Sequence, residues 1–366
     1  MNKAFKYRIY PTEEQEILFL KTFGCCRKVW NLMLSDKIEH YEKTKESLVV
    51  TPAKYKDEFP FLKEVDSLAL ANVQQHLGQA YKNFFEQPKV GFPKFKSKHH
   101  SRKSYTTNNN QKGSVAVLDG YIKLPKVGKV KAVIHRTAPN GWKLKTATVS
   151  MNPDGSFYVS VMYEYDYEPP VILIDYENSI GLDYKSDGLF MDSDGRKAEM
   201  PHFYRESQNK LAKAQRKQKH KKVGSNNYNK QKQKIAKVYR HMANQRKDYL
   251  EKLSTEIANQ YDVVIVESLN MKAMANKKFG NGKATLDNGY GMFLTMLERK
   301  LTHMGKVFLK VDKWFPSSQL CSCCGHKQKL SLSDRVFVCP ECGLKIDRDL
   351  NAAINIKNEG LQILTA

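Results

Sequence analysis

The sequence contains no apolar stretch of about 18 residues, the length that a membrane-spanning helix requires. Its N-terminal methionine is not followed by the apolar core of a secretory signal peptide. Acidic residues are also scarce: 38 Asp and Glu stand against 61 Lys and Arg, which gives a formal net charge of +23 at pH 7. Such an excess repels itself unless a polyanion offsets it. We therefore expect no membrane insertion. Binding to nucleic acid explains the positive charge better than a basic surface that only improves solubility.

Cysteine is sparse and unevenly placed. The chain of 366 residues has seven cysteines, of which five lie between residues 321 and 342 and two are the adjacent Cys25 and Cys26. An odd number, clustered in CxxC pairs without a secretion signal, favours metal binding in a reducing compartment over disulfide bonds. The hydrophobic content of 41% is that of a globular protein. A chain of this length is expected to form two or more domains.

The first part of the chain reads as strand, helix and loop in turn. Residues 1–10 alternate apolar and basic side chains, which predicts a short strand. Thr12 and Gln15 have the spacing of a capping box, so a helix is expected to begin there, and a helical period continues to about residue 87. Residues 88–105 mix basic and aromatic side chains and are expected to form a loop.

The period changes to two over residues 114–165, where turn signals such as NPDG separate four strand-like segments. This pattern predicts a small β-barrel or meander.

Beyond residue 165, strands alternate with helices, and Asp192 and Asp194 are expected in a hairpin turn. The basic stretch 201–250 has fifteen Lys or Arg and only two acidic residues, and it is expected to be helical. Further elements are a buried strand in 261–270, a helix in 290–305, a strand in 306–312 and a last helix that begins near Asp349.

Four cysteines form two CxxC pairs separated by fourteen residues: Cys321, Cys324, Cys339 and Cys342. Each pair presents two thiolates on one side of a tight turn, which Gly325 and Gly343 favour. A set of four thiolates predicts a closed, structural zinc site rather than a catalytic one. Cys323 departs from the regular spacing and is left out of the ligand set.

Three acidic residues stand at the ends of expected elements. Asp183 follows the strand-like SIGL, Glu267 follows DVVIV, and Asp349 begins the last helix. Each alone has a structural explanation, since such residues are often solvated in loops or cap helices. Together they predict carboxylates that meet at one edge of a rigid sheet and bind Mg²⁺ or Mn²⁺ for two-metal hydrolysis. A polyanionic substrate would also require the basic surface.

The chain resembles the TnpB (OrfB) family of RNA-guided nucleases. Insertion sequences encode these proteins, which are related to compact type V CRISPR effectors. The motifs that carry the resemblance run along the whole chain in family order: KYRIYPTEEQ, FGCCRKVWN, GFPKFKSK, IGLDYKSDGL, VVIVESLN, WFPSSQLCSCCGHK and RVFVCPECGLKIDRDLNAAINI. The last two are the most specific.

The resemblance implies a RuvC-type, RNase H-like nuclease whose Asp–Glu–Asp triad maps onto Asp183, Glu267 and Asp349. Asp347 is the competing third ligand, and the favoured role for it is to order the approach to the helix. The family's zinc ribbon maps onto the same four cysteines.

Two further features concern charges near this site. The resemblance implies that Arg335 neutralises the scissile phosphate. The family often has DLG after the first Asp, whereas this chain has DYKSDG, which sets Tyr184 and Lys185 beside the site.

The implied architecture is α+β and multidomain. It comprises a β-barrel wedge domain (1–10 and 96–172), a helical recognition domain (11–95), a RuvC-like domain (173–317 and 346–366) and an inserted zinc ribbon (318–345). The implied activity is cleavage of double-stranded DNA directed by a guide RNA from the element's own end, which pairs with the target strand beside a short flanking motif read by the protein. Cytoplasmic residence in a prokaryote is implied as well.

Two basic segments are the candidates for nucleic-acid contact. The loop 88–105 suits backbone contact combined with stacking, and the stretch 201–250 can neutralise many phosphates in a salt-dependent manner. Arg27 and Asn31 either lie near nucleic acid or pack a helix. The candidate residues are Lys94, Lys96, Lys98, Arg102, Lys103, Tyr105, Lys217, Lys219, Lys221 and Lys222.

Three rival functions are an RNA-guided repressor without nuclease activity, a transposase that joins DNA strands, and a zinc-ribbon RNA-binding protein. The intact acidic residues argue against the first. Only the family resemblance favours hydrolysis over strand transfer. The third requires the three acidic positions to be a coincidence.

Overall fold

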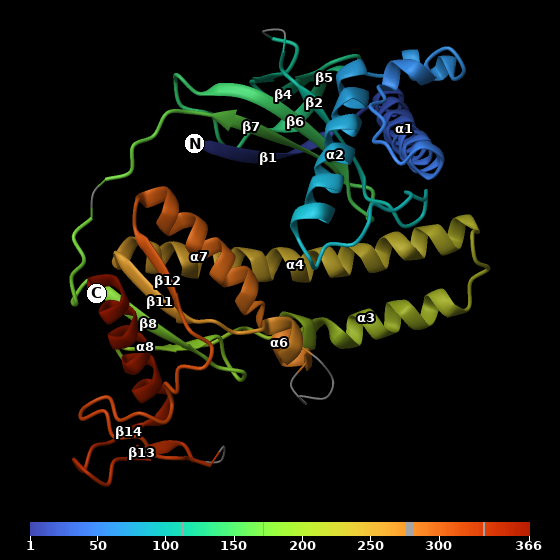
Figure 1. Ribbon diagram of the computed structural model, residues 1–366. Helices are drawn as coiled ribbons and strands as arrows, with labels where there is room; N and C mark the ends of the chain where they lie inside the picture. Colours follow the sequence, from blue (N-terminus) through green and yellow to red (C-terminus); the bar gives the residue numbers. More distant parts are fainter. Residues whose placement is uncertain (111–112, 171, 276–281, 332–333) are drawn as a thin grey trace. The chain divides into compact units, whose positions relative to one another are not determined.

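The computed structural model describes residues 1–110, 113–170, 172–275, 282–331 and 334–366 (Figure 1). The chain forms two compact units, Met1–Tyr167 and Glu168–Ala366. Within the described ranges, no helix has the length and apolarity needed to cross a membrane. The mixed helix and strand content expected from the sequence is confirmed in both units.

The first unit contains a seven-stranded antiparallel sheet in the order β2-β6-β7-β1-β5-β4-β3. Consecutive strands β3, β4 and β5 form a meander, while β1 inserts between β5 and β7. The strand expected at the N-terminus is therefore a central one. The strands are β1 (Asn2–Tyr10), β2 (Lys103–Asn108), β3 (Ala116–Leu118), β4 (Tyr121–Leu124), β5 (Gly128–Val133), β6 (Lys143–Met151) and β7 (Phe157–Glu164).

Two long helices, α1 (Glu13–Thr44) and α2 (Ser67–Glu86), pack against this sheet's β2 and against each other. The predicted capping box is confirmed, because the Thr12 side chain accepts from the Gln15 backbone and Gln15 bonds the Thr12 backbone in return. Two short 3₁₀ turns, η1 (Pro52–Tyr55) and η2 (Pro60–Lys63), interrupt the long helical region between the two helices.

The second unit contains a five-stranded sheet in the order β10-β9-β8-β11-β12. β8, β11 and β12 are parallel, and β9 and β10 add antiparallel strands at one edge. The strands are β8 (Ser179–Tyr184), β9 (Phe190–Asp192), β10 (Lys197–Ala198), β11 (Val263–Glu267) and β12 (Val307–Val311). The hairpin turn expected around Asp192 and Asp194 is confirmed between β9 and β10. Val171 of the segment PPVILI lies outside the described residues.

The helices of the second unit are α3 (Phe203–Lys219), α4 (Asn226–Gln260), α5 (Met271–Met274), α6 (Gly282–Asn288), α7 (Tyr290–Met304) and α8 (Arg348–Thr365). The basic stretch 201–250 forms α3 and most of α4, which run side by side as a helical hairpin (Figure 1). Its far end extends away from the sheet. Residues such as Leu211, Ile235 and Met242 form a small apolar core between the two helices.

Helix α8 lies directly on β8 and β11, because two glycines remove the side chains that would separate them. A Cβ on Gly181 of β8 would overlap the carbonyl oxygen of Ala353, and a Cβ on Gly360 of α8 would overlap the Ile265 side chain. This close contact fixes the helix on the strands whose carboxyl ends carry the acidic residues.

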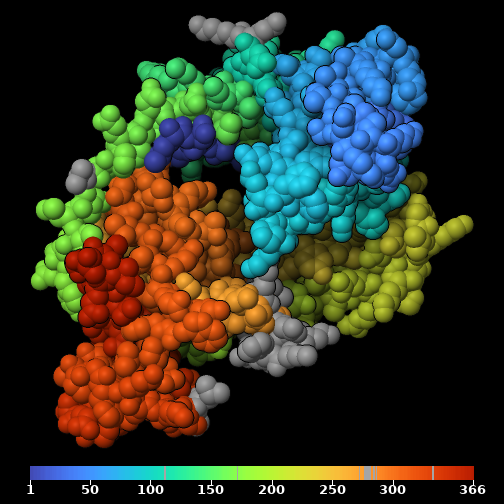
Figure 2. All heavy atoms as spheres, viewed as in Figure 1, coloured from blue at the N-terminus to red at the C-terminus, as the bar shows by residue number. Residues whose placement is uncertain are grey.

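The cysteine segment forms a small ribbon with its own two-stranded sheet, β13 (Val336–Val338) and β14 (Lys345–Asp347). Figure 2 shows the ribbon as a separate lobe of the second unit. Phe337 is buried beside Cys321 and Cys339, so the ribbon has a minimal core of its own. β14 continues without a break into α8.

Candidate metal centres and nucleic-acid interface

The four ribbon cysteines converge. The sulfur atoms of Cys321, Cys324, Cys339 and Cys342 all lie within 4.8 Å of one another, and this is the one such cluster of three or more metal-ligating side chains among the described residues. Cys323 is exposed and lies outside the cluster. Gly325 and Gly343 both adopt left-handed φ values, 75° and 73°, as the expected tight turns require. The arrangement fits one tetrahedral zinc ion.

Hydrogen bonds within the ribbon shift the pKa values of its thiols in opposite directions. A hydrogen bond from the Cys342 backbone is the main cause that lowers the pKa of the Cys339 thiol to about 6. Against a hydrogen bond from the Leu344 backbone, burial and hydrogen bonds with the neighbouring thiols raise the pKa of the Cys342 thiol. Zinc binds the thiolate form, so its binding releases the protons that these thiols hold.

Two buried asparagines of α8 attach the first cysteine pair to the helix. Asn351 Nδ2 donates to the Leu320 carbonyl at 2.7 Å, and its Oδ1 accepts from the Ser322 backbone at 3.0 Å. Asn355 Nδ2 donates to the carbonyls of Ser317 and Leu320, both at 2.8 Å. The only sequence signal for this attachment is the NAAIN pattern, and the attachment was not predicted from the sequence.

The three carboxylates predicted as a site come from three elements of the second unit. Leu182 of β8 pairs with Val266 of β11, so the next residues on the two parallel strands are Asp183 and Glu267. Asp349 lies in the first turn of α8, the helix held on β8 by Gly181. Because parallel strands lie about 4.8 Å apart, this topology places Asp183 and Glu267 side by side. Asp349 is close enough for its charge to act on Asp183, although the three carboxylates do not form a cluster as tight as that of the four cysteines.

Burial and neighbouring charges raise the pKa values of two of these acids. Burial raises the pKa of Asp183 well above its usual range, and the carboxylates of Glu267 and Asp349 raise it further. Lys185 and Arg348 offset only part of this effect. Burial also raises the pKa of Glu267.

Lys185 is the direct partner of the third acid. Its ammonium forms an ion pair with Asp349 Oδ2, and both side chains are largely buried, at 10% and 16% exposure. On the other oxygen, Arg348 Nε lies 3.8 Å from Asp349 Oδ1. The predicted Arg335 is exposed, and it is not among the charges that shift the pKa of Asp183. Sequence reasoning set Lys185 beside the site but missed both this ion pair and Arg348.

Asp347 has a different position from Asp349. It is the N-cap of α8, and its Oδ1 accepts from the backbone nitrogens of Asp349 at 2.9 Å and Leu350 at 3.1 Å. Its side chain is therefore engaged in starting the helix.

Buried aromatic groups lie behind the acids. Tyr290 is completely buried, and its pKa is raised by burial and by the charges of Asp183 and Glu267. Its ring lies 4.8 Å from that of Tyr184, centroid to centroid. Among the described residues, neither hydroxyl has a hydrogen-bond partner.

The carboxylates fit a hard divalent cation in donor chemistry and in charge. An all-oxygen set suits Mg²⁺ or Mn²⁺. The pKa of Asp183 is raised first by burial and then by the charges of Glu267 and Asp349, and a bound cation would favour its ionised form. Asp183 and Glu267 have no hydrogen bond or ion pair to another side chain in the described parts of the chain, whereas Asp349 forms an ion pair with Lys185.

The basic loop of the first unit is held to α1. Trp30 Nε1 donates to the Lys94 carbonyl at 3.0 Å, and the Asn31 side chain exchanges two hydrogen bonds with the backbone of Lys96, at 2.9 and 2.8 Å. The Lys96 ammonium lies 3.5 Å from the centre of the Trp30 ring. Asn31 therefore has the packing role that was one of its two alternatives.

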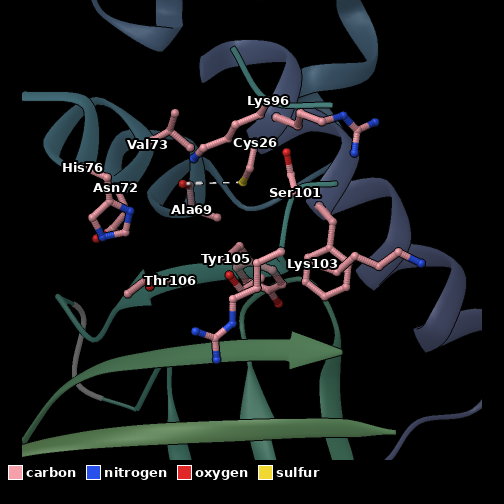
Figure 3. A pocket seen from close by; sticks show the side chains of 14 residues that line it. Cys26, Ala69, Asn72, Val73, His76, Lys96, Ser101, Lys103, Tyr105 and Thr106 are labelled. Atoms are coloured by element: carbon pink, nitrogen blue, oxygen red, sulfur yellow. Dashed lines mark hydrogen bonds between the residues drawn. The ribbon is translucent and has the colours of Figure 1, made fainter. Parts of the chain in front are cut away.

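The loop borders a basic pocket of about 270 Å³ between α1, α2 and β2. In Figure 3, Lys96 and Cys26 lie on one side of it and Tyr105 and Thr106 on the opposite side, with His76 at its end. Arg27, Arg102 and Lys103 also line it. Lys94 and Lys98 are exposed on the same loop.

Two expectations for this segment need correction. The loop was expected to extend through residue 105, but Lys103 already begins strand β2. Tyr105 was expected to contact nucleic acid, but it is 5% exposed because its ring packs against Phe19 and Phe23. Alternation along β2 turns its ring inward. Phe92 and Phe95 are the exposed aromatic residues of the segment, at 43% and 58%.

A second basic surface is the groove between α3 and α4, with a volume of about 420 Å³. Lysines from both helices line it, together with His241: Lys210, Lys213, Lys217, Lys234 and Lys237. Of the predicted lysines only Lys217 lies in the groove, while Lys219, Lys221 and Lys222 are at the end of the hairpin. The helical period, not the density of charge, decides which lysines share this face.

Family comparisons agree with this organisation. A helix-turn-helix domain of OrfB from IS605 matches residues 1–46, a domain described as "Probable transposase" matches 162–278, and the TNB domain of Cas12f1-like proteins matches 290–356. These matches define an insertion-sequence protein with a Cas12f1-like C-terminal part.

Two curated proteins match almost the whole chain. A "Putative RNA-guided DNA endonuclease" of Streptomyces pristinaespiralis is 34% identical over 99% of this chain and 90% of its own length. The Escherichia coli protein named "Putative RNA-guided DNA endonuclease InsQ" is 30% identical over 99% of this chain and 93% of its own. The chain therefore belongs to the TnpB (OrfB) family of IS605-type elements, which is related to type V effectors.

The fold is also similar to that of Cas12f1, solved as a complex with sgRNA and target DNA. The TM-score is 0.62 with 13% sequence identity, and the alignment covers 98% of this chain and 99% of Cas12f1. At this identity the similarity concerns the fold alone.

Proposed function

We propose that the protein is an RNA-guided DNA endonuclease of a transposable element. The observation that supports the proposal is that Asp183 and Glu267 follow paired residues of the parallel strands β8 and β11, while Asp349, in the first turn of α8, is close enough for its charge to act on Asp183. The names of the two full-length relatives support the same activity. The guide RNA would come from the element's own end, and the site of action would be the cytoplasm of a prokaryote.

The domains would divide as the family resemblance implies. Residues 173–317 and 346–366 would form the RuvC-type, RNase H-like nuclease, with the zinc ribbon inserted at 318–345. Residues 1–10 and 96–172 would form the wedge domain, and 11–95 the recognition domain. The basic pocket of the first unit and the lysine groove of α3 and α4 would contact nucleic-acid backbones, which carry most of the affinity.

Asp183, Glu267 and Asp349 would hold two ions of Mg²⁺ or Mn²⁺, and the four cysteines would hold a structural zinc ion. The chemistry supplied by the bound divalent ions is activation of the attacking water and stabilisation of the leaving oxygen. The protein's own contribution is rigidity: β8 and β11 fix two acids in register, and the contact of Gly181 with α8 fixes the third. Arg348 and the predicted Arg335 would offset phosphate charge.

A second candidate is an RNA-guided repressor that binds without cutting. The ion pair between Lys185 and Asp349 favours it, because that contact occupies the third acid. The same experiment separates the two functions.

The test is cleavage of plasmid DNA that carries a guide-matched target beside a randomised flank. The protein is co-purified with RNA from its own locus and assayed with Mg²⁺ or with EDTA. Cutting that needs Mg²⁺ and falls at least ~10³-fold in Asp183→Ala, Glu267→Ala and Asp349→Ala is the expected result. Asp347→Ala is the matched control and should still cut. Guide-dependent binding without cutting would support the repressor.

A further inference from the structure

Lys185 is held in place by the turn that follows β8. Its backbone nitrogen donates to the Leu189 carbonyl at 3.2 Å, which closes the turn between β8 and β9. Asn288 Nδ2 donates to the carbonyl of the next residue, Ser186, at 3.0 Å. With its side chain only 10% exposed, the lysine points into the acidic edge of the sheet and not into solvent.

The acids of the site are unequally neutralised. Asp349 has the Lys185 ammonium on Oδ2 and Arg348 within 3.8 Å of Oδ1. Within the described ranges, no ion pair reaches Asp183 or Glu267. The first two acids are thus open to a divalent cation, while the third already has a cation built into the chain.

An ammonium and a divalent ion compete for the same carboxylate. A lone pair that accepts an N–H bond from Lys185 cannot at the same time coordinate a metal, and the two positive charges repel each other at this short range. Lys185 sits on a flexible stem of four carbons and binds phosphate oxygens as a point charge, so it can be drawn from one anion to another.

We propose that Lys185 is an internal cation that regulates metal loading of the carboxylate site. In the protein without substrate it holds Asp349, so Asp183 and Glu267 bind one divalent ion and the second binds weakly. A phosphate of the bound nucleic acid draws the ammonium away, and Asp349 then completes the site. The inference rests on the proposed function, since it takes the three acids as the metal ligands.

The first test is a titration of the full-length, zinc-loaded protein with Mn²⁺, in which free Mn²⁺ is followed by its electron paramagnetic resonance signal. Wild type should bind one Mn²⁺ tightly. Lys185→Met should bind two, or bind the second at least ~10-fold more tightly, because the competing charge is gone. Lys185→Arg, which keeps the charge, should resemble wild type. Equal Mn²⁺ binding by Lys185→Met and wild type would overturn the inference.

Matched variants keep the result interpretable. Lys197→Met removes a lysine of the same sheet that is 40% exposed and 3.8 Å from Asp187, and it should leave Mn²⁺ binding unchanged. Lys185→Gln replaces Lys185→Met if the latter melts at a lower temperature than wild type. Asp183→Asn separates two failures. If it does not weaken Mn²⁺ binding, the proposed site itself is wrong; if it does while Lys185→Met has no effect, only the role of Lys185 is wrong.

The cleavage assay gives an independent check. Lys185→Met should reach half of its maximal cutting at a lower Mg²⁺ concentration than wild type. If the variant instead cuts more slowly at saturating Mg²⁺ and binds Mn²⁺ as wild type does, Lys185 contacts the reacting phosphate and the regulatory inference is overturned.

Discussion

The ribbon and the carboxylate edge are both candidate metal sites, but the chain builds them in opposite ways. The ribbon draws its four cysteines from 22 consecutive residues, Cys321 to Cys342, and their sulfur atoms already lie within 4.8 Å of one another. The carboxylate edge draws its acids from β8, β11 and α8, and consecutive acids are more than 80 positions apart in the sequence. Its third acid is paired with a lysine.

The two sites also differ in the metal occupancy that they favour. Four converging thiols with tight turns form a closed site that suits permanent occupancy. If the three carboxylates hold metal as proposed, their unequal neutralisation would let the occupancy of the site change with substrate. The two sites meet at α8, where Asn351 and Asn355 hold the ribbon and Asp349 faces the sheet.

The largest expected effect is on the ribbon. Cys339→Ser removes one of four zinc ligands, and structural zinc contributes about 10 kcal/mol or more of folding free energy in small domains. We expect zinc content to fall from one ion per chain to near zero by mass spectrometry of the native protein. Cys323→Ser is the matched control, because Cys323 lies outside the cluster. Equal zinc loss in both variants would contradict the assignment of ligands.

The second prediction acts on the carboxylate edge and spares the ribbon. Gly181→Ala places a Cβ against the backbone of α8 and should lower the free energy of unfolding by about 3 kcal/mol. Gly291→Ala in α7 meets its nearest side-chain atom, Met271 Cγ, at an ordinary 3.8 Å and should be neutral or slightly stabilising. Urea denaturation compares the two variants. Similar stability would show that α8 does not lie so closely on β8.

The third prediction acts on the connection between the two sites. Asn351→Ala removes two hydrogen bonds, one to the Leu320 carbonyl, which keeps Asn355 Nδ2 as a donor, and one from the Ser322 nitrogen, and this loss costs about 2 kcal/mol. Zinc should then pass to a chelator faster than from wild type, as followed by the chelator's absorbance. The partly exposed Asn358 on the same helix supplies the control, Asn358→Ala. An unchanged release rate would mean that the asparagines do not restrain the ribbon.

The smallest expected effect separates the two aspartates of KIDRDLNAA. Asp347→Ala removes the N-cap of α8 and should cost about 1 kcal/mol. Mn²⁺ binding should persist in this variant and be weakened in Asp349→Ala. The reverse pattern in a Mn²⁺ titration would move the third ligand to Asp347.

The features found from the sequence depend on local spacing. The strand at 1–10, the capping box of Thr12 and Gln15, and the cysteine pairs are each specified by residues close together in the chain. The three acids were predicted as a site because each one stands near the end of a strand or at the start of a helix. Local patterns also placed the basic helices of 201–250 correctly.

The features that were missed depend on contacts between distant segments. The ion pair of Lys185 with Asp349 joins residues 164 positions apart, and nothing near Lys185 in the sequence indicates its partner. Tyr105 is buried because α1 supplies Phe19 and Phe23. Arg348 lies 3.8 Å from Asp349 because the ribbon's β14 leads into α8 at that residue. Composition and period carry none of this information.

The most direct test of the carboxylate site is metal-directed cleavage of the protein itself. Fe²⁺ replaces the divalent ion in the zinc-loaded protein, and ascorbate with peroxide generates radicals that cut the backbone near the bound iron. The account predicts cuts beside Asp183, Glu267 and Asp349, suppressed by excess Mg²⁺ and lost in Asp183→Ala. Cuts elsewhere, or cuts at these positions that persist in Asp183→Ala, would contradict a metal site built from these three acids.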